Sequence, residues 1–332
     1  MNAQEQAHPP SNVRAAVSNA IAPPDFELPL PDKPEIITAN LLKLIEQTPN
    51  PRNKLIFQLL VKHIHAFINE ANLSTDEWMT AIEFLTRVGQ TCTPLRQEMI
   101  LLSDVLGVSA LVDSLNNPVT GGATENSVLG PFFTEDAADV EAGGSIVSDS
   151  EEVNMYMQGR ILSTEGKPIS DAIIDTWEAD ANGFYDTQYV DRTHPDYRGR
   201  LHSAEDGSFG YRAIVPRAYP VPGDGPVGEL LLAMNRHNMR PNHLHIMIEA
   251  PGYHKLITAL YPEGCSYLVS DPVFGVKKSL VVKLQRINDD QEARKRGFLK
   301  GGSFMLLQHD FILLTEEQSK ALRGHAINSG GQ

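Results

Sequence analysis

The chain has 332 residues, 41% of them hydrophobic, and a formal net charge of −14 at pH 7. At about 150 residues per domain, this length predicts roughly two domains with enough apolar residues for a real core. The acidic charge argues against nucleic acids and anionic membranes as partners, so an anionic substrate would need a local cation. The longest apolar runs, 230–234 and 311–314, are too short to span a bilayer.

The cysteine content and the N-terminus indicate the compartment. Cys92 and Cys265 are too few for a secreted disulfide framework or a thiolate zinc site. The N-terminus has no basic segment followed by an apolar one, which a secretory signal would need. We therefore expect a soluble, cytoplasmic enzyme.

Composition divides the chain into three predicted segments. Residues 1–36 are polar and rich in proline, which predicts a flexible N-terminal arm. Residues 37–120 carry apolar stripes at helical spacing, which predict a helical and linker domain. Residues 121–320 are dominated by short alternating segments separated by glycine-containing turns, which predict a β domain.

Three or four helices are expected between residues 37 and 116. Ser74 and Glu77 form a capping box at the start of one of them. Another is expected to start at Pro94, since proline suits the first helical position, and its apolar residues continue to Leu115.

The β domain is predicted to be a sandwich or a barrel, because many short strands alternate with turns. The expected strands are 155–161, 172–177, 209–214, 244–248, 255–260, 280–284 and 305–314.

Two histidines are the strongest local sign of a metal site. His243 and His245 are two residues apart in a segment expected to be a strand. On a strand, residues i and i+2 point to the same face, so both imidazoles would project together from one rigid element. A metal site needs that arrangement, although two histidines on a solvated face would give the same pattern.

Two tyrosines are candidate partners for these histidines. Tyr185 follows a turn, and Tyr219 lies between Pro216 and Pro220. Taken alone, each is more typical of a packed aromatic ring with a bonded hydroxyl. As phenolates, they are hard anionic donors that favour a trivalent cation, which in turn lowers the pKa of the bound phenols. Two phenolates on iron(III) would leave a charge of about +1, enough to bind a catecholate dianion.

Four stretches of the chain resemble the intradiol ring-cleavage dioxygenases. They are residues 122–133, 175–185, 215–219 and 240–245, and the similarity extends over about residues 40–315. The resemblance implies an α+β fold, with an N-terminal helical dimerisation domain and a mainly antiparallel β-sandwich catalytic domain.

Within the family, the chain is most similar to the branch that cleaves hydroxyquinol. This likeness rests on residues 177–180, 219–228 and 270–277. The catechol branch differs in these stretches and carries a glutamine where this chain has Ala259. The implied reaction inserts both atoms of O₂ into hydroxyquinol and opens the ring between two hydroxylated carbons, giving maleylacetate (3-hydroxy-cis,cis-muconate). Catechol is the alternative substrate.

The resemblance also implies one iron(III) per chain, held by Tyr185, Tyr219, His243 and His245. Tyr219 would leave the metal when substrate binds and accept a substrate proton, which is general-base work. Arg240 would face the ring and stabilise developing charge. A surface arginine paired with an acid is the alternative interpretation for Arg240.

The substrate pocket is expected to include Leu101, Asp104, Val128, Leu129 and Gly130. Relatives place residues from these segments beside the ring, and largely apolar walls suit an aromatic ligand. Asp104 would accept a hydrogen bond from the third hydroxyl of hydroxyquinol. Ordinary core packing is the alternative for Leu101 and Val128, and a solvated helix face is the alternative for Asp104.

Relatives dimerise through the N-terminal helices and hold a phospholipid between the subunits, so we expect a homodimer with a lipid at the interface. Two other protein classes remain open. The 166–172 segment also resembles non-catalytic transthyretin-like binding modules, which have no use for the tyrosine–histidine set. A cupin with Zn²⁺ or Fe²⁺ would need a third histidine or a carboxylate at set spacing, and the sequence shows none.

Overall fold

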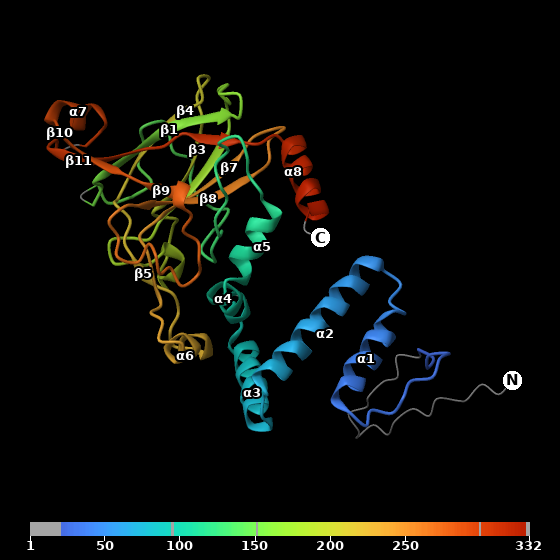
Figure 1. The fold of residues 1–332 in the computed structure, drawn as a ribbon. Coiled ribbons are helices and arrows are strands. Elements are labelled where there is room, and N and C mark those ends of the chain that lie inside the picture. Colours follow the sequence, from blue (N-terminus) through green and yellow to red (C-terminus); the bar gives the residue numbers. More distant parts are fainter. Residues whose placement is uncertain (1–20, 94–95, 151, 299, 330–332) are drawn as a thin grey trace, which may run out of the picture. The chain divides into compact units, whose positions relative to one another are not determined.

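The computed structural model describes residues 21–93, 96–150, 152–298 and 300–329 (Figure 1). Most of the predicted N-terminal arm, residues 1–20, lies outside these ranges. The chain forms two compact units, Met1–Ile82 and Glu83–Gln332. Within the described ranges, no helix is both long and apolar enough to cross a membrane.

The first unit contains α1 (Pro34–Ile45), α2 (Pro51–Ala71) and the start of α3 (Thr75–Thr91). Helix α1 begins inside the segment that was predicted to be arm. The capping box is confirmed: a Glu77 carboxylate oxygen accepts from the Ser74 backbone N–H at 2.9 Å, and the Glu77 N–H donates to the Ser74 hydroxyl at 3.3 Å.

The helix that was expected to start at Pro94 does not continue to Leu115. Pro94 lies outside the described residues, and α4 (Glu98–Val105) is separate from α5 (Val108–Asn116). Between them, Gly107 adopts a φ of +73°, a conformation that glycine accepts without strain and that ends the α4 helix.

Two five-stranded sheets form the β-sandwich of the second unit (Figure 1). The first has the order β10-β11-β1-β12, with β4 paired to β1, and the second has the order β3-β2-β7-β8-β9. The first comprises β1 (Met155–Ser163), β4 (Ser208–Ala213), β10 (Leu284–Asn288), β11 (Ser303–Gln308) and β12 (Phe311–Leu313). The second comprises β2 (Ile173–Trp177), β3 (Arg198–His202), β7 (Leu244–Glu249), β8 (Leu256–Pro262) and β9 (Val281–Val282).

Alternating apolar residues of both sheets build the core. Met155 and Met157 of β1, and Leu244 and Ile246 of β7, are each fully buried in one cluster. Most strand pairs are antiparallel; β1 pairs in parallel with β11 and β12, and β8 with β9. The sandwich prediction is confirmed, and β7 lies between β2 and β8 in the second sheet.

Several elements differ from the predicted strands. The expected strand 280–284 is divided among η2 (Lys278–Leu280), β9 and β10, and 305–314 is divided between β11 and β12. Strand β3 was missed because its side chains are polar. The missed elements also include η1 (Asp186–Gln188), β5 (Tyr219–Pro220), β6 (Met239–Arg240), α6 (Pro226–Ala233), α7 (Asp290–Lys295) and α8 (Glu316–Ser329).

Candidate metal centre

Two buried imidazoles meet at the start of β7. His243 immediately precedes the strand, His245 lies within it, and each is 1% exposed. Their Nε2 atoms are 3.0 Å apart. The Nδ1 of His243 is 2.8 Å from the Pro241 carbonyl, to which it can only donate, so its Nε2 carries a lone pair.

Both candidate tyrosines reach the same point. The Tyr185 hydroxyl is 3.4 Å from His243 Nε2 and 3.5 Å from the Tyr219 hydroxyl. Tyr185 follows a turn in which Gly183 has a φ of +86°, and a Cβ there would lie 3.3 Å from the Tyr219 Cβ. Glycine therefore permits both the turn and the close approach of this turn to Tyr219. Strand β5 carries Tyr219 and pairs it with Arg240 of β6.

Burial favours the neutral forms of His243, His245 and Tyr185 in the absence of a cation. It lowers the pKa of both His243 and His245 well below the ordinary value, and the charge of Arg240 acts in the same direction. It raises the pKa of Tyr185 well above the ordinary value, and the neighbouring Tyr219 adds to this effect. A bound cation would reverse the preference of the phenol and favour the phenolate.

One ring nitrogen of His245 makes no hydrogen bond with the described residues: its Nδ1 is buried and has no partner among them. If Nδ1 carries the proton, two Nε2 lone pairs face each other at 3.0 Å. If Nε2 carries it, the Nδ1 lone pair is left unpaired. A cation held by both Nε2 atoms removes the repulsion between the lone pairs, so the residues fit a metal ion.

Arg240 is buried at this point, with 3% of its surface exposed, so the surface-arginine alternative is wrong. Its Nη1 lies 3.4 Å from the Tyr219 hydroxyl and 3.1 Å from His243 Nε2. Burial disfavours its charge, but Asp271, Tyr219 and Tyr261 together outweigh burial and raise the pKa of the guanidinium well above its ordinary value. A permanent positive charge therefore lies beside the four donors.

Of the expected pocket residues, Gly130 lies directly against the site. A Cβ at this position would be 3.6 Å from His245 Cε1. Leu101 and Val128 are partly buried and pack on the apolar cluster that contains Val105, which agrees with ordinary packing as well as with a pocket wall. Leu129 is 36% exposed.

Asp104 is half-buried on α4. Burial raises the pKa of its carboxyl above the ordinary value, while a hydrogen bond from Ser109 and the charge of Arg240 lower it. Asp104 is thus close enough to Arg240 to be influenced by its charge, and a fully solvated helix face is excluded.

Comparison with known proteins identifies the family. Residues 128–314 match the family model described as Dioxygenase, and residues 50–124 match the one described as Catechol dioxygenase N terminus. The chain belongs to the intradiol ring-cleavage dioxygenases. It is 44% identical over 287 residues to an intradiol ring-cleavage dioxygenase of Aspergillus niger, with 86% of each chain covered. Members of this family are non-haem iron enzymes, so the cupin and transthyretin-like alternatives are wrong.

Two further relatives carry a more specific name. A hydroxyquinol 1,2-dioxygenase of a Rhizobium species is 45% identical over 266 residues, covering 80% of this chain and 90% of that protein. The crystal structure of hydroxyquinol 1,2-dioxygenase from Pseudomonas putida DLL-E4 is similar with a TM-score of 0.80 at 43% identity. It covers 85% of this chain and 98% of that one.

Aromatic rings that were not singled out from the sequence hold the dioxygenase site in place. The Trp177 ring stacks on His245 with centroids 4.7 Å apart and planes 4° apart. Phe132 stacks on Tyr185 at 4.4 Å and 18°. Trp177 and Phe132 lie in the stretches that carry the family resemblance, and their position there is the sequence signal that could have identified them. The stacking fixes the ring planes of two candidate ligands.

Two further partners of Arg240, namely Asp271 and Tyr261, were also missed. Tyr261 lies on β8, the strand beside the histidines. Among the described residues, no group of three or more His, Cys, Asp or Glu side chains is placed to hold a metal. Among the described side chains, Tyr185 and Tyr219 are oxygen donors that lie beside the two histidines and can complete a donor set with them.

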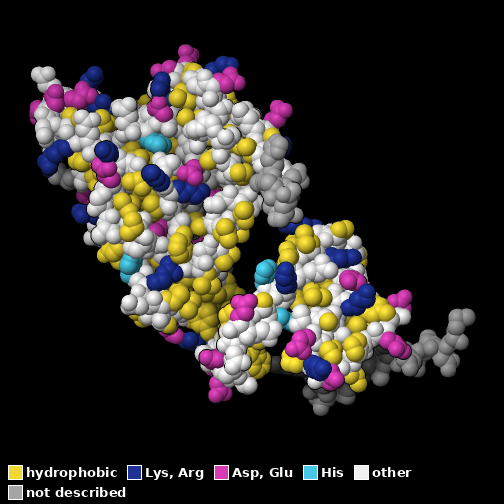
Figure 2. Space-filling view, in the orientation of Figure 1, with side chains coloured by type: hydrophobic (Ala, Val, Ile, Leu, Met, Phe, Trp, Pro, Cys, Tyr) yellow, Lys and Arg dark blue, Asp and Glu magenta, His cyan; other side chains and the backbone are white. Residues whose placement is uncertain are grey.

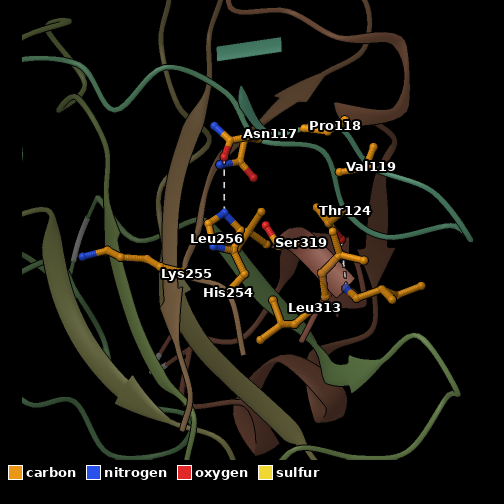
Figure 3. Close-up of a pocket in the computed structure, with 12 residues that line it drawn as sticks. Asn117, Pro118, Val119, Thr124, His254, Lys255, Leu256, Leu313 and Ser319 are labelled. Carbon is orange, nitrogen blue, oxygen red and sulfur yellow. Dashed lines mark hydrogen bonds between the residues drawn. The ribbon is translucent and has the colours of Figure 1, made fainter. Parts of the chain in front are cut away.

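A small cavity elsewhere in the sandwich is separate from this site (Figure 3). Its volume is about 10 Å³, roughly the space that one water molecule needs. Asn117 and His254 border it and lie 3.2 Å apart, and Ser319 of α8 also lines it. None of the candidate ligands lines this cavity.

Proposed function

We propose that this enzyme cleaves the ring of hydroxyquinol (1,2,4-trihydroxybenzene) between two hydroxylated carbons, inserting both atoms of O₂ to give maleylacetate. The observation that carries the proposal is the convergence of Tyr185, Tyr219, His243 and His245 on one buried point beside Arg240. The names of the relatives at 43–45% identity support hydroxyquinol as the substrate. Catechol is the second candidate substrate.

In this proposal the four side chains hold one iron(III) per chain. The ion would supply Lewis acidity, binding the substrate oxygens and activating the aromatic ring towards O₂. Tyr185 remains a permanent anionic ligand, held by its stacking on Phe132. His243 presents its Nε2 because its Nδ1 proton is bonded to the Pro241 carbonyl.

Two residues act on the substrate itself. Tyr219 accepts a proton from a substrate hydroxyl, and its oxygen lies 3.4 Å from Arg240 Nη1. Arg240 stabilises negative charge that develops on the ring and its oxygens, and the exclusion of water strengthens this effect. Leu101, Val128, Leu129 and Gly130 form the wall beside the ring.

Asp104 is proposed to select hydroxyquinol over catechol. Its carboxylate would accept a hydrogen bond from the third hydroxyl, and catechol would leave that acceptor unpaired. Loss of one charge-assisted bond costs about 1.5–3 kcal/mol, or roughly ten- to a hundredfold in specificity. We expect iron-loaded protein to prefer hydroxyquinol by at least about tenfold in kcat/KM, measured by oxygen uptake and product analysis.

Asp104→Ala should shrink this preference, mainly by lowering activity on hydroxyquinol. The matched control is Asp113→Ala, which removes another half-buried aspartate that pairs with Lys277 at 3.0 Å. The control should leave the ratio unchanged. A wild-type preference for catechol would contradict the proposed substrate, and an unchanged ratio in Asp104→Ala would contradict only the role of this residue.

A homodimer with a phospholipid at its interface is proposed from the apolar helices. Helix α2 has no buried residue in the single chain, and large apolar side chains lie exposed on it, among them Leu60 (54%) and Phe67 (59%). Figure 2 shows hydrophobic side chains at the surface of the unit that contains α2. Contiguous exposed apolar surface of this kind marks an interaction site.

The cytoplasmic location of the enzyme and the domain boundaries at residues 36 and 120 also stay predictions.

We expect light scattering at micromolar concentration to give the mass of a dimer. The paired change Leu60→Glu and Phe67→Glu places two charges seven residues apart on one helix face and should yield monomers. A monomeric wild-type protein would contradict the proposal.

A further inference from the structure

Asp271 holds the far side of the Arg240 guanidinium. The aspartate is 5% exposed, and each of its oxygens accepts two hydrogen bonds. Oδ1 accepts from Arg240 Nε at 3.2 Å and from the Val273 N–H at 3.3 Å. Oδ2 accepts from Arg240 Nη2 at 3.3 Å and from the Gly275 N–H at 2.9 Å. The same carboxylate therefore fixes both the 271–275 turn and the Arg240 guanidinium.

The 271–275 turn is built at a conformational cost. Phe274 has a φ of +56°, which is unfavourable for a bulky side chain and persists only where the surroundings enforce it. Its N–H donates to the Asp271 carbonyl at 3.1 Å. Arg236 stacks on the Phe274 ring at 5.1 Å and donates to the Pro272 carbonyl at 3.0 Å. These contacts hold the turn against Arg240.

Gly275 leaves no room for a side chain beside the guanidinium. A Cβ at this position would lie 2.8 Å from Arg240 Nη2 and 2.8 Å from the Tyr261 hydroxyl. Tyr261 itself accepts from Arg240 Nη2 at 3.3 Å and is bonded to Ser127 Oγ at 3.2 Å. Because Nε and Nη2 of Arg240 are occupied in this way, Nη1 is the guanidinium nitrogen that faces Tyr219.

We propose that Asp271 is a positioning residue for ring cleavage: through the 271–275 turn it orients Arg240 so that Nη1 faces Tyr219 and His243. The inference rests on the proposed function, because it assigns Asp271 to the substrate side of the same site. A buried guanidinium needs a counter-charge, and a carboxylate that accepts from two of its nitrogens also fixes its plane.

Asp271→Asn tests the proposal with little change in side-chain volume. The amide keeps one acceptor oxygen but removes the charge and places an NH₂ group where Oδ1 or Oδ2 accepted hydrogen bonds. We expect kcat for hydroxyquinol to fall by about ten- to a hundredfold. Iron content, and the dissociation constant for hydroxyquinol measured without oxygen, should change by less than about threefold, because the loss concerns charge that develops during the reaction.

Asp175→Asn is the matched control. Asp175 is 3% exposed, accepts from Arg200 Nε at 2.9 Å and makes no hydrogen bond with a candidate ligand. Both variants should lower the melting temperature, since each weakens the pairing of a buried aspartate with an arginine. Only Asp271→Asn should lower kcat.

Gly275→Ala displaces Arg240 while the Asp271 charge stays. The backbone at Gly275 is not left-handed, so the added methyl acts through its contacts, 2.8 Å from Arg240 Nη2 and from the Tyr261 hydroxyl and 3.2 Å from Asp271 Oδ2. We expect the same loss of kcat with iron retained. In an Arg240→Gln background, Asp271→Asn should cause no further loss, because a residue that acts through Arg240 has nothing left to position.

Two results would overturn the inference. One is wild-type kcat in both iron-loaded Asp271→Asn and Gly275→Ala. The other is a further fall in kcat when Asp271→Asn is added to Arg240→Gln, as large as the fall that Asp271→Asn causes alone. A general structural defect would produce that result. A wild-type protein that cleaves neither hydroxyquinol nor catechol would instead refute the proposed function, and the inference with it.

Discussion

Tyr219→Phe should lower kcat for hydroxyquinol by about 10²- to 10⁴-fold, the usual contribution of a general base, while most of the iron is retained. The change removes one hydroxyl from a ring that is 4% exposed. Tyr185 and both histidines remain to hold the ion. The measurements are steady-state oxygen uptake and iron content per chain.

Tyr211→Phe is the control for this variant. Tyr211 is also a fully buried tyrosine, but its hydroxyl bonds Thr176 at 2.8 Å in the sandwich core. It should lose some stability and keep its kcat. If Tyr219→Phe retained wild-type kcat at full iron loading, Tyr219 would not be the base.

Tyr185→Phe should instead release the iron. It removes the anionic ligand that stays bound throughout the reaction, and we expect the affinity for iron(III) to fall by about a hundredfold or more, beyond what changes of outer partners cause. Burial raises the pKa of this phenol, so the phenolate exists there only with a cation to stabilise it. Competition with a chelator measures the change.

The comparison between the two tyrosine variants separates their roles. Tyr219→Phe serves as the control for Tyr185→Phe, because both remove one phenol oxygen from the same buried site. Equal iron loss and identical visible spectra in the two variants would contradict the division into a permanent ligand and a base.

The candidate ligands were predictable from the sequence because their signals are local. His243 and His245 share a face through the two-residue period of a strand, and Tyr185 and Tyr219 stand beside turn and proline signals. Their convergence is a property of the sandwich and became predictable only through the family resemblance. In the structure, each of these four side chains lies within 3.5 Å of another member of the set.

The partners of Arg240 were not predictable in this way. Tyr261 and Asp271 are 21 and 31 residues from Arg240 in the chain, on β8 and on a turn beyond it. No local periodicity links such residues, because the sheet and the 271–275 turn bring them together. The close approach of Gly275 to the guanidinium likewise exists only in the folded chain.

The fold predictions followed the same pattern. The capping box at Ser74 was readable because all its atoms belong to four consecutive residues. Strand β3 was missed because Arg198 and Arg200 break the apolar alternation, and they are accommodated by Asp186 and Asp175. The break of α4 before α5 occurs at Gly107, whose φ of +73° is a local property of glycine, and it was missed because the apolar residues continue beyond it.

Metal analysis combined with a visible spectrum tests the central claim most directly. The purified protein should contain about one iron(III) per chain and be red to purple, because a phenolate bound to iron(III) absorbs visible light. The band should change when hydroxyquinol is added without oxygen. Stoichiometric zinc with no visible band would contradict the assignment of Tyr185, Tyr219, His243 and His245 as iron ligands.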